Sequence, residues 1–118
     1  FSLGKSTIEI NEKLADYVAS DVSKLAKQKK IIILGAAFKA NNDDFRDSLS
    51  FRLYKILSRL SFSKIILYDP LVDHIKVSTN KNLLNFKKDF FVLATPHKIF
   101  DKLLRKIPSD NLYNIWKS

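Results

Sequence analysis

Three short, mostly apolar runs are the strongest indication of the fold in this sequence. They lie at residues 31–38, 64–68 and 90–94 and are rich in isoleucine, leucine, valine and phenylalanine. Each run is shorter than a typical helix, and its apolar residues occupy both faces of the strand that it predicts. Strands buried on both faces are typical of a parallel sheet covered by helices. A further run at residues 112–116 predicts a fourth strand.

The segments between these runs carry apolar residues at three- and four-residue spacing. This period predicts amphipathic helices over residues 8–26 and 46–61. A third helix is expected to end at Ile107, with Thr95 as its N-cap and Pro96 in its first turn.

The order of these elements determines the predicted fold class. Helices alternate with strands, and only residues 71–89 show no clear period beyond a short helix or turn. Such alternation is produced by right-handed crossovers between parallel strands. We therefore expect an α/β fold, a three-layer Rossmann-like parallel sheet with helices on both faces, preceded by an N-terminal helix.

The chain is strongly basic, and the charge is unevenly distributed. The 118 residues carry a formal net charge of +9, and the last third of the chain holds the largest share. A basic surface is typical of proteins that bind nucleic acid, acidic lipid or a phosphorylated small molecule. A lysine-rich face that serves only solvation explains the same composition, so charge alone does not select a partner.

Several classes of protein are excluded by residues that the chain lacks. It contains no cysteine, which excludes disulfides, thiolate metal sites and a cysteine nucleophile within this chain. The two histidines, His74 and His97, form no metal-ligand signature, and we identify no catalytic residue and no metal site. The chain begins with Phe1 and contains no methionine, so we expect it to be part of a longer protein or a processed product.

No membrane segment or secretory signal is expected. The longest apolar run, at residues 31–38, is far shorter than the roughly 20 residues that a membrane-spanning helix needs. We therefore expect a soluble protein of a reducing compartment, the cytoplasm, without a membrane partner.

Ligands of parallel sheets bind beyond the carboxyl ends of the strands. In this sequence that rule selects residues 38–48, 69–73 and 95–98. Gly35 is the only glycine after the first strand, so the chain has neither a G-x-G-x-x-G turn nor a P-loop.

Two cations remain as candidate phosphate ligands after the first strand. Lys39 can meet a phosphate as a point charge, and Arg46 can make a two-pronged contact to a phosphate or carboxylate. The alternative is that Arg46 only pairs with Asp43 and Asp44 on the surface of the loop.

The same segment resembles a known family motif. Gly35-Ala36-Ala37-Phe38-Lys39-Ala40-Asn41-Asn42-Asp43-Asp44-Phe45-Arg46-Asp47-Ser48 is similar to G-x-A-F-K-P-x-T-D-D-x-R-E-S-P. That motif opens the C-terminal domain of the UDP-glucose/GDP-mannose dehydrogenases, the nucleotide-sugar 6-dehydrogenases. The segments 68–70 and 88–100 resemble the Y-D-P and A-D-x-x-V-L-x-T-x-H-x-x-F motifs of the family, and the first helix resembles the end of its central helix. Four positions depart from the first motif, namely Ala40, Asn42, Asp47 and Leu49.

The resemblance implies a function for the full enzyme and for this part of it. Such enzymes oxidise the sugar C6 alcohol of a nucleotide sugar to a uronic acid with NAD, through a thioester on a cysteine that this chain lacks. The resemblance makes residues 1–29 the end of the central helix and residues 30–118 the UDP-sugar-binding domain. In the family, the positions of Phe38 and Lys39 contact the nucleotide sugar, and that of Arg46 reaches NAD.

The resemblance also implies partners that this chain does not contain. NAD would be bound mainly by the enzyme's N-terminal domain, and the full-length enzyme would be a homo-oligomer. His97 lies in an H-x-x-F pattern that resembles the branch acting on UDP-N-acetylhexosamines, for surface polysaccharide synthesis. A further family arginine has no clear equivalent, although Lys117 is a candidate.

Two other interpretations remain open from the sequence. The basic last third allows a stand-alone module that binds nucleic acid, although aromatic RNA-binding motifs and basic recognition helices are absent. The four departures from the motif allow a truncated remnant that folds and binds nothing.

Overall fold

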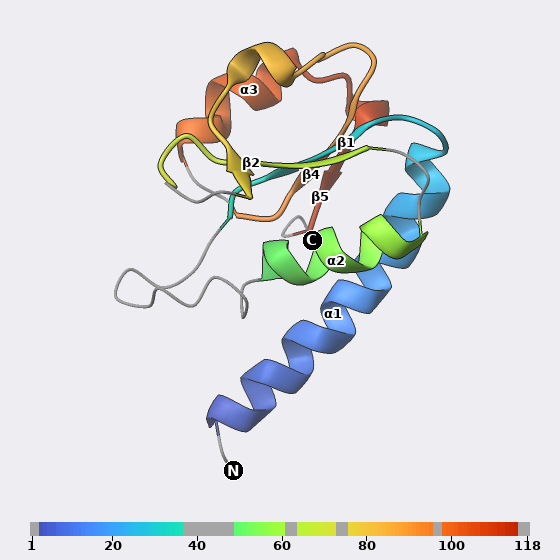
Figure 1. The fold of residues 1–118 in the computed structure, drawn as a ribbon, viewed down its shortest axis with the longest axis vertical. Coiled ribbons are helices and arrows are strands. Elements are labelled where there is room, and N and C mark those ends of the chain that lie inside the picture. The colour runs from blue at the N-terminus through green and yellow to red at the C-terminus, as the bar shows by residue number, and fades with distance from the viewer. Residues whose placement is uncertain (1–2, 37–48, 61–63, 73–75, 96–97, 116–118) are drawn as a thin grey trace.

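The protein is described from a computed structural model, which covers residues 3–36, 49–60, 64–72, 76–95 and 98–115. Its centre is a parallel sheet of five strands in the order β3-β2-β1-β4-β5 (Figure 1). The strands are β1 (Ile31–Leu34), β2 (Ile65–Tyr68), β3 (Val77–Ser78), β4 (Phe90–Leu93) and β5 (Leu112–Asn114).

Helices cover both faces of this sheet. Two longer helices, α1 (Leu3–Ala26) and α2 (Leu49–Leu60), lie on one face, as Figure 1 shows. The short helix α3 (Asp101–Lys106) lies on the other face, after a 3-10 turn at Lys98–Phe100. The expected three-layer α/β fold with an N-terminal helix is therefore confirmed.

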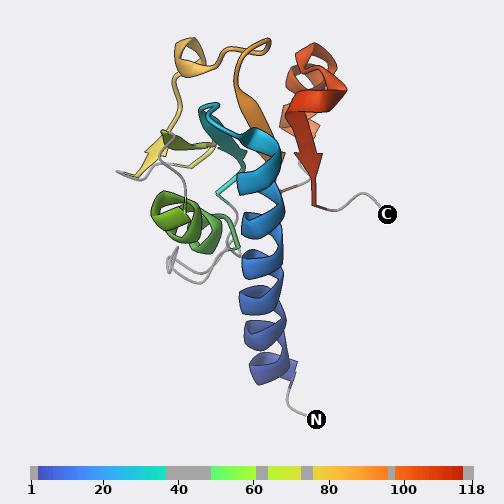
Figure 2. The same ribbon diagram turned by 90° about the vertical axis from the view of Figure 1, so that its right-hand side faces the viewer.

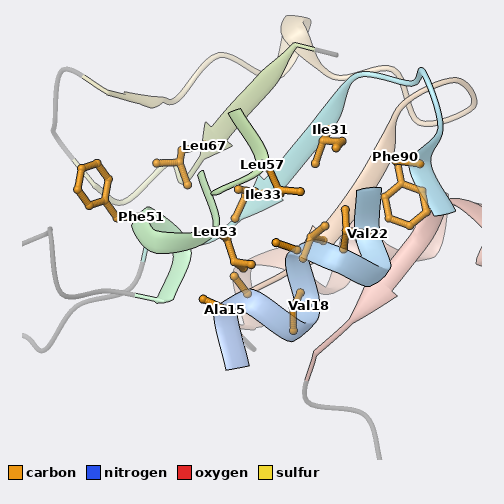
Figure 3. Packing of buried hydrophobic residues seen from close by; sticks show 14 of the residues in the cluster. Ala15, Val18, Val22, Ile31, Ile33, Phe51, Leu53, Leu57, Leu67 and Phe90 are labelled. Atoms are coloured by element: carbon orange, nitrogen blue, oxygen red, sulfur yellow. The ribbon is translucent and has the colours of Figure 1, made fainter. Parts of the chain in front are cut away.

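The sheet separates two hydrophobic cores because successive side chains of a strand point to opposite faces. Ile31 and Ile33 of β1 lie in the core shared with α1 and α2 (Figure 3). Ile32 and Leu34 lie in the second core, with Phe100 of the α3 side. All four strand residues are fully buried, which explains why the run is apolar at every position.

The first helix contributes directly to the larger core. Ala15, Val18, Ala19, Val22 and Ala26 are all buried in one cluster with the sheet and α2 (Figure 3). Their spacing of three, four and one residues follows one side of the helix. The C-terminal half of α1 is therefore packed into the same unit as the sheet, and the division between residues 1–29 and 30–118 stays a prediction.

The boundaries of several elements differ from those predicted. β1 ends at Leu34 rather than at residue 38, because Gly35 has a φ of 96° that turns the chain out of the strand. β3 was not predicted, since two residues are too few to show a period. The described part of the helix before Ile107 begins at Lys98, and the buried Thr95 hydroxyl has no hydrogen-bond partner among the described residues. Pro96, predicted in the first turn, lies outside the described residues, so the N-cap role of Thr95 stays a prediction.

A hydrogen bond joins α1 to the edge strand β5. The Tyr113 hydroxyl donates to Oδ2 of Asp21 over 3.1 Å. Burial, followed by the hydrogen bond to Asp21 and its charge, raises the pKa of Tyr113 to about 12. The folded protein therefore holds this proton at a pH where the unfolded chain, with a pKa of about 10, loses it.

The consequence is a loss of stability in alkaline solution. The contribution of Tyr113 is complete below pH 10 and disappears as the pH rises from about 10 to 12. Tyr113→Phe is expected to destabilise the protein by about 1 kcal/mol at neutral pH. The difference from the parent should shrink between pH 10 and 12 in urea titrations. A difference that stays constant with pH would contradict this role of Tyr113.

Candidate functional site

The site selected by the sequence lies where three central strands end. The strands β1, β2 and β4 run in register, so the residues that follow them meet at one edge, here called the carboxyl edge. The N–H of Gly35 donates to the carbonyl of Tyr68 over 2.9 Å, and the N–H of Thr95 donates to the carbonyl of Leu34 over 3.2 Å. Gly35, Asp69 and Thr95 are therefore neighbours in space although they lie far apart in the sequence.

Asp69 connects the carboxyl ends of β1 and β2 through hydrogen bonds. Its side chain is buried, and Oδ2 accepts the N–H of Ala36 over 3.1 Å. Its Oδ1 accepts the N–H of Leu71 over 2.9 Å, which closes a turn after β2. The Asp69 N–H donates to the backbone carbonyl of Ser78 in β3 over 3.0 Å. One residue thus holds the carboxyl ends of β1 and β2 in place and ties β3 to them.

Gly35 and Thr95 pack tightly against each other at this edge. A Cβ at Gly35 would lie 2.5 Å from Cβ and 2.6 Å from Oγ1 of Thr95. The hydroxyl of Ser50 at the start of α2 donates to the Gly35 carbonyl. The backbone at position 35 is therefore enclosed between the end of β4 and the first turn of α2, and only glycine fits there.

Two buried hydroxyls near these strand ends have no hydrogen-bond partner among the residues that the structure describes. They are Oγ1 of Thr95 and the hydroxyl of Tyr68. Burial, and to a lesser degree the charge of Asp69, raises the pKa of Tyr68, so its hydroxyl stays protonated at neutral pH. Both groups are neutral at neutral pH and are available as hydrogen-bond donors.

The three residues predicted to bind ligands, Phe38, Lys39 and Arg46, lie outside the described residues, as do His97 and Lys117. The structure does place both flanks of their segment at the carboxyl edge. Ala36 is held by Asp69, and Ser50 is held by the Gly35 carbonyl. The edge chosen from the sequence therefore carries both anchors of residues 37–48.

Two features of this edge were missed in the sequence. Asp69 was placed in a candidate ligand segment and in the Y-D-P motif, and its structural role was not predicted, although an aspartate before Pro70 commonly accepts the N–H two residues on and so closes a turn. The contact between Gly35 and Thr95 has no sequence signal, because it depends on the pairing of two strands that are distant in the sequence.

The fold and its carboxyl edge define a Rossmann-like α/β domain of the kind that binds nucleotides beyond its strands. Comparison with family models gives a more specific result: residues 32–113 match the UDP binding domain of the UDP-glucose/GDP-mannose dehydrogenase family. The chain belongs to this family, and the resemblance seen in its motifs is confirmed.

A solved structure supports the same fold. The chain is similar to a derivative structure of the UDP-N-acetyl-mannosamine dehydrogenase Cap5O from S. aureus, with a TM-score of 0.68 and 21% sequence identity. The match covers 91% of this chain and 32% of that chain. No curated protein matched this chain. Among the helices that the structure describes, none is long and apolar enough to cross a membrane.

Proposed function

We propose that this chain is the nucleotide-sugar-binding domain of an NAD-dependent UDP-sugar 6-dehydrogenase. The observation that carries the proposal is the match of residues 32–113 to the UDP binding domain of a dehydrogenase family. The full enzyme would oxidise the C6 alcohol of the sugar to a carboxylate, in the cytoplasm, for surface polysaccharide synthesis. The cysteine for the thioester would lie elsewhere in that enzyme, since this chain has none.

Within this proposal the carboxyl edge receives the UDP-sugar. Lys39 would contact the charged nucleotide sugar beside Phe38, on the segment whose flanks are held by Asp69 and Ser50. A lysine suits this task because its ammonium is a compact charge that meets phosphate oxygens from several directions.

NAD does not fit the described part of this chain as a resident cofactor. A dinucleotide needs a glycine-rich turn whose backbone lets the pyrophosphate approach. Here the turn after β1 has one glycine, and the side chain of Thr95 fills the space against it. We therefore assign NAD to the N-terminal domain of the enzyme, with Arg46 as the proposed contact from this chain.

Calorimetric titration with UDP, UDP-N-acetylglucosamine, UDP-glucose and GDP-mannose tests the proposal. We expect saturable binding of the uridine nucleotides. Lys39→Ala should weaken it about tenfold or more, because a hydrogen bond to a charged group contributes about 1.5–3 kcal/mol. Lys64→Ala, at the start of β2 on the opposite edge, removes the same charge and should leave the affinity unchanged.

Equal affinities of the parent and the Lys39→Ala variant would refute the role of Lys39. If no nucleotide sugar binds, the titration is repeated on the full-length enzyme, and failure there would leave a fold without this function. Tighter binding of UDP-N-acetylglucosamine than of UDP-glucose would support the N-acetylhexosamine branch that the position of His97 favours. An RNA oligomer serves as the control for a nucleic-acid-binding module.

A further inference from the structure

The edge of the sheet opposite the candidate site is strongly basic. All strands begin there, and the N–H groups of Ile31 and Phe90 donate to the carbonyls of Lys64 and Lys30 over 2.9 and 2.8 Å. The lysines before neighbouring strands therefore lie side by side. The helices α2 and α3 end at the same edge, because each leads back to the start of a strand (Figure 2).

Some cations of this edge serve the fold itself. Lys29 donates to the side chain of Asn111 over 2.6 Å, and Lys30 pairs with the buried Asp89 over 3.2 Å. Lys106 lies over the ring of Phe86, 5.6 Å from its centroid. These contacts help to hold the loops before β1, β4 and β5 together. The presence of these three cations at the edge is therefore explained by their role in the fold.

Other cations of the edge are exposed and have no such explanation. We name them the basic edge: Lys27, Arg59, Lys64, Lys87, Lys88 and Arg105. Within the described residues, no carboxylate forms an ion pair with any of them. Arg59 and Arg105 lie in the last turns of helices, where a cation is favourable. The four lysines lie outside helices, so this effect does not account for them.

Exposed leucines occur at the same edge of the sheet. Leu25 in the last turn of α1 and Leu60 at the end of α2 are each 55% exposed. Leu83 is 36% exposed, and its carbonyl accepts a hydrogen bond from Lys30. A single exposed leucine needs no explanation. Exposed leucines and clustered lysines at one edge, however, are the composition of surfaces that bind the headgroup layer of an anionic membrane.

We propose that the basic edge, together with Leu25 and Leu60, binds the surface of a membrane that contains anionic phospholipids. Lysines supply point charges that suit a diffuse layer of lipid phosphates, and leucines can enter the boundary of the acyl chains. Nucleic acid would instead favour aromatic side chains that stack on bases. Binding through this edge leaves the carboxyl edge, at the other end of the strands, facing the solvent.

Sedimentation of the chain with lipid vesicles tests whether membrane binding depends on the positive charge of the basic edge. Vesicles of phosphatidylcholine and phosphatidylglycerol should bind it, and vesicles of phosphatidylcholine alone should not. Lys64→Glu with Lys88→Glu should lower the partition coefficient roughly 30-fold or more. The control pair Lys13→Glu with Lys98→Glu changes the net charge equally on exposed positions away from this edge, in the middle of α1 and after the carboxyl end of β4. An equal loss in both pairs would overturn the proposal, since only net charge would then matter.

A second comparison separates lipid from nucleic acid. Leu60→Ser should weaken vesicle binding several-fold, whereas Leu71→Ser, at a position of similar exposure on the carboxyl edge, should not. Neither change should alter the binding of an RNA oligomer. The membrane proposal would be overturned in favour of nucleic acid by two results together. Leu60→Ser would leave vesicle binding unchanged, and Lys64→Glu with Lys88→Glu would abolish RNA binding. Circular dichroism of each variant verifies folding.

Discussion

Gly35→Ala is expected to lower the free energy of unfolding by about 3 kcal/mol. Two separate costs contribute to this value. The backbone at Gly35 has a φ of 96°, which an alanine adopts only with strain. The added methyl would also lie 2.5 Å from Cβ of Thr95, so the ends of β1 and β4 must move apart. Urea unfolding followed by circular dichroism measures the loss.

A second substitution separates these two costs. Thr95→Gly removes the atoms that the new methyl meets, so it should recover part of the stability lost in Gly35→Ala and leave the backbone strain. Thr95→Ser keeps the clashing Cβ and should recover nothing. A loss below about 0.5 kcal/mol in Gly35→Ala would show that the close approach does not constrain the fold.

Leu53→Ala is expected to destabilise the protein by about 3–5 kcal/mol. Leu53 is fully buried on α2 and lies in the larger core with α1 and β1 (Figure 3). The two helices and the sheet meet around this side chain, so its removal leaves a cavity that no single element can close. The expected result is a lower urea midpoint with an unchanged denaturant slope.

The same helix provides the matched control. Leu60, at the end of α2, is 55% exposed, and Leu60→Ala should change stability by less than about 0.5 kcal/mol. Equal losses at both positions would mean that the apolar stripe of α2 is not packed as described. The comparison holds residue type and helix constant and varies only burial.

The fold class was predictable because the signals for it are local and redundant. The run Ile31–Leu34 is buried at all four positions, and a strand between two layers of helices needs this pattern. The stripe of α2 was predictable for the same reason, since Leu53 and Leu57 recur at helical spacing on the buried side. The carboxyl edge then followed from the general placement of ligand sites in parallel sheets.

The details of the candidate site were less predictable, because they arise from pairs of residues distant in the sequence. Ala36 and Asp69 are joined by a hydrogen bond across 33 positions, and no local pattern marks such a pair. The exact end of β1 was missed because Ala36 and its neighbours are as apolar as the strand, and the turn depends on the φ of Gly35.

The amino-acid sequence alone predicted the alternation of helices and strands, the burial of the sheet on both faces and the membership of a dehydrogenase family. These properties follow from hydrophobic periodicity and from short motifs, and both can be recognised without knowing which residues are in contact. The folded chain was needed to see which strand ends meet, that Thr95 lies against Gly35, and that lysines from separate loops lie side by side at the opposite edge. Strand register and crossover direction bring these distant residues together, and neither property is specified by any one segment of the chain.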